Sequence, residues 1–77
     1  MKIWLIEAPW PPKYEYISAV VIANTKKEAA LLHPDDRQWD GKECPKGTWC
    51  ASKDVKVTEI GVSILKEFNG VVCYELR

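Results

Sequence analysis

The chain has 77 residues, of which 47% are hydrophobic and 29% are charged, a composition that predicts one folded globular domain and excludes an intrinsically disordered chain. Its 11 basic residues equal its 11 acidic residues, so it lacks the positive field on which binding to duplex nucleic acid depends. Zero net charge also removes self-repulsion between copies, which favours a homo-oligomer.

The first residues carry neither a secretion signal nor a membrane segment. The apolar run in MKIWLIEAPWPP is shorter than a secretory signal requires. No stretch reaches the roughly 20 apolar residues of a membrane span. We therefore expect a cytoplasmic protein without a membrane contact, in which the three cysteines remain thiols.

Two β-rich segments precede the first helix signal. Residues 2–8, KIWLIEA, are apolar on both faces, which predicts a buried central strand. The prolines of the connector 9–13, PWPPK, prevent strand pairing and leave Trp10 in a stiff loop. Residues 14–23, YEYISAVVIA, predict a second strand. Its alternation places Ile17, Ala19 and Val21 on one face and Tyr14, Tyr16, Val20 and Ile22 on the other.

A short helix is predicted at residues 26–33. Thr25 and Glu28 have the spacing of a capping box, in which the Thr25 hydroxyl accepts from the Glu28 amide and the Glu28 carboxylate accepts from the Thr25 amide. Pro34 ends the helix. Because two helical turns are marginal alone, this helix must dock on the sheet.

The second half of the chain predicts a long loop and two further strands. Residues 35–54 have no periodicity, and so long a loop in a small domain is usually functional or mobile. Residues 54–61 and 70–77 alternate as strands do. The pair Asn69-Gly70 suits a type I′ turn, so residues 62–68 are interpreted as a strand paired with the last one, or else as a looser connector.

These elements predict an α+β fold in one domain, residues 1–77. The order β-β-α-(long loop)-β-β implies a mostly antiparallel sheet with the short helix packed on one face. The opposite face of that sheet still needs cover.

The stretch 33–50, HPDDRQWDGKECPKGTWC, holds most of the reactive side chains. Zinc binding by His33, Cys44, Cys50 and Cys73 is disfavoured, because structural sites use close ligand pairs and five residues separate Cys44 from Cys50. The same two cysteines can close a disulfide loop in an oxidising compartment, and otherwise they are two thiols in a loop. We expect no metal site.

The sequence contains no signature of an enzyme. It has no glycine-rich phosphate loop, metal-binding carboxylate cluster or nucleophile elbow. His33, between a helix and a proline, is a poor general base for a cysteine nucleophile. Asp35 and Asp36 are interpreted as turn caps. We therefore expect no catalytic residues and no cofactor.

The tryptophans are the stronger functional signal. Trp10, Trp39 and Trp49 all fall in predicted loops, where a flat ring can stack on a ligand base or anchor a protein contact. Nearby cations, Arg37, Lys42 and Lys46, can bind phosphate. An alternative of equal weight is that these rings fold back and cover the sheet as part of the core.

Several motifs together resemble a family of small uncharacterised proteins encoded by phages, prophages and bacteria. The resemblance rests on the strands MKIWLI and YEYISAVVIA, on NTKKEAALLHP, on the WDG motif at 39–41 and the Trp49-Cys50 pair, and on VKVTEIG and GVVCYEL. The connector PWPPK and the ending YELR depart from the family pattern.

The resemblance implies a phage accessory protein in the host cytoplasm that counters host defence. One mode is a sponge, an oligomer that sequesters a nucleotide-derived immune signal. A second is an inhibitor that docks on a host defence protein such as a nuclease or a CRISPR effector, and a third is a structural or regulatory phage protein. For the sponge we expect a ligand site formed by Trp10, Arg37, Trp39, Asp40, Lys42 and Trp49.

Overall fold

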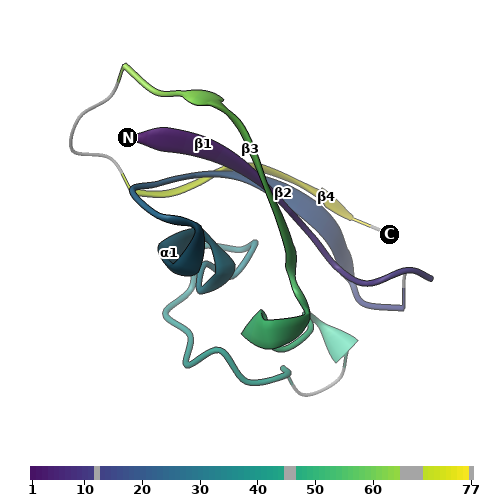
Figure 1. Cartoon of the computed structure of the whole chain (residues 1–77). Coiled ribbons are helices and arrows are strands. Elements are labelled where there is room, and N and C mark those ends of the chain that lie inside the picture. Colours follow the sequence, from purple (N-terminus) through teal and green to yellow (C-terminus); the bar gives the residue numbers. More distant parts are fainter. Residues whose placement is uncertain (12, 45–46, 65–68, 77) are drawn as a thin grey trace.

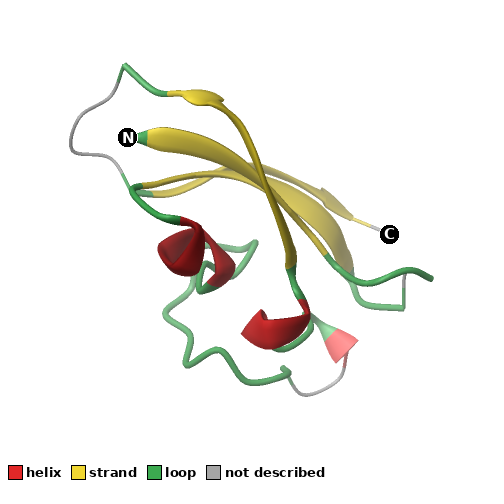
Figure 2. Ribbon diagram, in the orientation of Figure 1, coloured by secondary structure: helices red, strands yellow, loops and turns green. Residues whose placement is uncertain are grey.

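The computed structural model describes residues 1–11, 13–44, 47–64 and 69–76. It is a four-stranded antiparallel sheet with a short helix on one face, the α+β arrangement that the sequence predicts (Figures 1 and 2). The elements are β1 (Lys2–Glu7), β2 (Tyr16–Ala23), α1 (Lys26–Ala30), a 3-10 turn (Ser52–Asp54), β3 (Lys56–Val62) and β4 (Gly70–Leu76).

The strand order is β3-β1-β2-β4, so β1 is a central strand, as its apolar faces predict. The predicted pairing of residues 62–68 with the last strand does not hold at Val62, which belongs to β3 and is paired with Lys2 of β1. Val62 ends β3, whereas residues 65–68 lie outside the described residues.

A bulge in β2 corrects the predicted faces of that strand. Tyr16 is paired with Leu76 and Ser18 with Glu75, so Ile17 is an extra residue on β2. The extra residue reverses the alternation of side chains. As a result Tyr16 is buried in the same core cluster as Ala19 and Val21, and does not share a face with Val20.

The helix is shorter than predicted but begins where its cap indicates. Thr25 Oγ1 accepts from the Glu28 amide at 3.2 Å, while the Glu28 carboxylate accepts from the amide of Asn24, one residue before the predicted partner, at 3.3 Å. The helix ends at Ala30 with Leu31 as its C-cap, earlier than Pro34 requires, because a proline restricts only the residue before it, here His33. The buried His33 therefore follows the helix instead of ending it.

The core lies between the sheet and the cover formed by α1 and the loop after it, which Figure 1 shows on the same side of the sheet. Its buried members include Trp4, Ile6, Tyr14, Tyr16, Val21, Ala29, Trp49 and Cys50. Trp4 is fixed within it, because its indole N–H donates to the Ala23 carbonyl at 3.0 Å. Among the described residues, no helix is long and apolar enough to cross a membrane.

Candidate ligand-binding site

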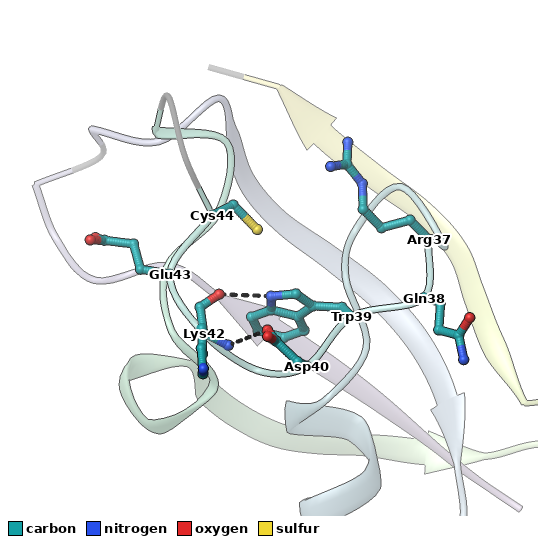
Figure 3. A pocket seen from close by; sticks show the side chains of 7 residues that line it. All are labelled: Arg37, Gln38, Trp39, Asp40, Lys42, Glu43 and Cys44. Atoms are coloured by element: carbon teal, nitrogen blue, oxygen red, sulfur yellow. Dashed lines mark hydrogen bonds between the residues drawn. The ribbon is translucent and has the colours of Figure 1, made fainter.

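An open cleft of about 690 Å3 lies in the loop that follows α1 (Figure 3). Its volume falls within the range of roughly 300–1,000 Å3 that small-molecule sites occupy. Its lining residues are Arg37, Gln38, Trp39, Asp40, Lys42, Glu43 and Cys44. The cleft is thus formed by one continuous stretch of chain.

Trp39 is the centre of the cleft and is only partly buried. Its indole N–H donates to the backbone carbonyl of Lys42 at 2.7 Å, and its ring meets the His33 ring edge-on, with 5.8 Å between centroids. Figure 3 shows the Cys44 thiol pointing toward the ring and the Asp40 carboxylate beside it. The ring therefore packs on the core and also lines the cleft.

Gly41 gives the loop its tight bend. Its φ of 86° lies in the left-handed region, which favours glycine, and a Cβ there would approach Ser52 Oγ to 2.9 Å. The Ser52 amide donates to the Gly41 carbonyl at 2.8 Å. Beside it the Lys42 amide donates to Asp40 Oδ1 at 3.0 Å. These contacts explain why a WDG sequence suits this bend.

Arg37 is held by an acidic neighbour outside the cleft lining. Its Nε donates to Asp35 Oδ2 at 2.7 Å, and its Nη2 is ion-paired with the same oxygen. This hydrogen bond with the guanidinium holds the pKa of Asp35 below its ordinary value. The Arg37 side chain is still 53% exposed, so the guanidinium can contact solvent and a ligand.

The remaining charges of the cleft are Lys42, Asp40 and Glu43. Among the described residues Lys42 forms no ion pair. Glu43 Oε1 accepts from the Tyr14 hydroxyl at 2.6 Å, and this bond raises the pKa of Tyr14 to about 12. With two cations and two carboxylates in its lining, the cleft has no excess of positive charge.

His33 lies behind the cleft and is fully buried. Its Nδ1 accepts from the Asp35 amide at 3.1 Å and lies 2.8 Å from Asp35 Oδ1. Nε2 of the ring has no hydrogen-bond partner within the described part of the chain. Burial lowers the pKa of His33, against an opposing effect of Asp35.

The structure brings together four of the six predicted site residues. Arg37, Trp39, Asp40 and Lys42 all line the cleft. Trp49 is fully buried in the core, which corrects its assignment as a ligand contact, because a side chain without exposed surface cannot meet a ligand. Lys46 lies outside the described residues.

Trp10 is separate from the cleft. It is 87% exposed in the connector between β1 and β2, and it is not among the residues that line the cleft. Sequence reasoning missed Gln38, Glu43 and Cys44 as lining residues. Their position next to Trp39 in the same loop was the only available signal.

The three cysteines are all thiols, with Cys44 and Cys50 buried and Cys73 exposed. Burial raises the pKa of Cys50 to about 11, so its thiol is protonated and unreactive at neutral pH. Across residues 1–11, 13–44, 47–64 and 69–76, no three side chains of the metal-binding types His, Cys, Asp and Glu are grouped closely enough to hold an ion.

Comparisons with protein-family models, with curated proteins and with solved structures gave no match for this chain.

Proposed function

We propose that the protein is a non-enzymatic binding protein of phage or prophage origin that inhibits host defence by sequestering a nucleotide-derived immune signal. One observation carries the proposal. The partly buried ring of Trp39 lies in an open cleft with the side chains of Arg37 and Lys42 on either side of it (Figure 3). An indole stacks on any nucleobase, while guanidinium and ammonium groups bind phosphate.

The charges of the cleft favour a small ligand over a polyanion. Two carboxylates, Asp40 and Glu43, balance the two cations of the lining, so a long phosphate backbone gains little there. Asp35 occupies the Nε edge of the Arg37 guanidinium, and the opposite edge remains able to donate to one phosphate. Together with the Lys42 ammonium, which forms no ion pair within the described part of the chain, this arrangement suits a nucleotide with one or two phosphates.

Titration of the purified protein with cyclic dinucleotides, cyclic trinucleotides and ADP-ribose tests the proposal. A bound nucleotide quenches tryptophan fluorescence and raises the melting temperature, since ligand at 100 times Kd stabilises the folded state by about 2.7 kcal/mol. Chromatography of the released ligand should show that it is chemically unchanged, because a non-enzymatic binding protein does not convert its ligand.

Matched lysine variants locate the site. Lys42→Ala removes the cleft ammonium and should weaken binding about tenfold, the loss of one charge-assisted contact. Lys53→Ala removes another exposed lysine, in the 3-10 turn and outside the cleft lining, and should change binding less than twofold. The nucleotide site would be rejected if no nucleotide of the panel bound, or if the two variants lost the same amount of binding affinity.

An alternative function, inhibition of a host defence protein by direct docking, is favoured by Trp10. The side chain is 87% exposed on a proline-rich connector, and an exposed tryptophan on a stiff loop is typical of an interface anchor. Capture of a nuclease or CRISPR effector by the wild-type protein, and its loss in Trp10→Ala with nucleotide binding absent, would support this function instead.

A further inference from the structure

β4 is an edge strand that carries exposed apolar side chains. Among the described residues no strand pairs with that edge, and Val72, Tyr74 and Leu76 are 56%, 53% and 51% exposed. The helix packs against β1, β2 and β3, so it does not cover this strand. The unpaired backbone groups of such an edge favour the addition of another strand.

The two edges of the sheet differ in their side chains. β3 carries Lys56 and Glu59, and Glu59 is ion-paired with Lys2 on the neighbouring strand at 3.4 Å. Charged side chains, above all lysine, protect edge strands from pairing. β4 contains no lysine or proline, and Glu75 is its one charged residue. Each edge strand carries one extra residue, Ile60 in β3 and Val72 in β4, so the side chains make the difference.

We propose that two copies of the chain join by antiparallel pairing of their β4 strands, about a two-fold axis near Cys73, the midpoint of Gly70–Leu76. The two four-stranded sheets then form one continuous sheet. Because the two-fold axis uses the same surface on both copies, the assembly closes as a dimer, and the charged β3 edges remain outside.

The sequence of β4 is complementary to itself in this orientation. Antiparallel pairing about Cys73 brings Val72, the extra residue of the β4 bulge, next to the partner's Tyr74, and by symmetry this contact of an aromatic and a β-branched residue occurs twice. Glu75 then faces the partner's Val71, so the two carboxylates do not oppose one another. In-register parallel pairing would instead place the Glu75 side chains directly opposite, which is unfavourable.

A strand of a second copy suits this surface better than a small molecule. The hollow beside β4, lined by Ser18, Ala19, Val20, Cys73, Tyr74 and Glu75, measures about 170 Å3, below the usual volume of a ligand site. The chain has no net charge, so two copies approach without long-range repulsion. This proposal does not depend on nucleotide binding at Trp39.

The test compares two valine-to-lysine variants in analytical ultracentrifugation over a wide range of concentrations. Val72→Lys replaces an exposed valine of β4 and removes both symmetric contacts with Tyr74, which should weaken the dimer about tenfold. Val62→Lys makes the same change at a 74% exposed valine of β3 and should alter dimerisation less than twofold. If Val72→Lys fails to fold by circular dichroism, Leu76→Lys at the end of the strand replaces it.

Crosslinking supplies a second readout. Opposed residues in an antiparallel pair have Cα atoms roughly 4.5–5.5 Å apart, so a short bis-maleimide should join the exposed Cys73 thiols of two copies, while the buried Cys44 and Cys50 remain unmodified. Cys73→Ser should abolish the product. A wild-type protein that stays monomeric, a dimer equally weakened by Val62→Lys, or an edge that binds an unrelated peptide but not a second copy would overturn the proposal.

Discussion

The indole nitrogen of Trp39 lies 2.7 Å from the backbone oxygen of Lys42, to which it donates a hydrogen bond. The ring that is proposed to stack on a ligand therefore also closes the loop that carries the phosphate-binding lysine. Stability and binding are coupled at this residue, so its variants must be measured for both.

We predict graded losses of stability for two substitutions of Trp39. Trp39→Phe keeps an aromatic ring but loses the bond to Lys42, which should cost about 1 kcal/mol. Trp39→Ala also loses the edge contact with His33 and should cost about 2 kcal/mol, roughly half of the value for a fully buried tryptophan. Urea unfolding gives both numbers, and identical stabilities for the two variants would show that the ring is not packed.

For Trp49 we predict a far larger effect of the same substitution. The side chain has no exposed surface, so Trp49→Ala should cost about 3–5 kcal/mol, similar to the whole stability expected of so small a domain. The variant should lose cooperative thermal unfolding. Trp49→Phe should remain folded, because it keeps most of the apolar contacts and removes an indole N–H that has no partner in the described part of the chain.

The contrast between these two rings marks the limit of what the sequence can predict. Both lie in one loop without periodicity, and nothing local distinguishes a ring at the edge of the core from one inside it. The strands and the Thr25 cap were predictable because their signals are local. The strand order, the bulge at Ile17 and the bond from Tyr14 to Glu43 depend on contacts between distant residues.

Tyr14 should make the protein sensitive to alkaline pH. Its folded pKa of about 12 lies above the ordinary value of 10.0, so the protonated hydroxyl is favoured by folding. The contribution of Tyr14 to the free energy of unfolding is complete below pH 10 and is lost as the pH rises from 10 toward 12. Tyr14→Phe should be less stable than the wild type at pH 8 by about 1–2 kcal/mol, and the difference should shrink above pH 10.

Cys50 must be separated from this effect, because its pKa is also raised, from 9.0 to about 11. Its contribution disappears between pH 9 and 11, which overlaps with the window of Tyr14. Cys50→Ala should therefore remove the part of the loss that begins at pH 9 and leave the Tyr14 part, which runs from pH 10 to 12. A Tyr14→Phe protein with the same alkaline profile as the wild type would contradict the role of the bond to Glu43.

At acid pH the stability of the fold should depend on His33. Because burial lowers the folded pKa of His33 below the ordinary 6.5, the folded state binds fewer protons than the unfolded state. The contribution of His33 to the free energy of unfolding is complete above pH 6.5 and is lost as the pH falls through the folded pKa. The lowered pKa of Asp35 acts in the same direction, but only below its ordinary value of 3.8.

The two groups can therefore be resolved by urea unfolding at a series of pH values between 8 and 3. The chain has a single histidine, so a loss of stability that begins near pH 6.5 belongs to His33. In His33→Asn, the side-chain oxygen can accept from the Asp35 amide in place of Nδ1 but does not titrate. That variant should be less stable at pH 8 and nearly independent of pH between 7 and 5. A wild-type profile that is flat in this range would mean that the ring accepts a proton while it remains buried against Asp35.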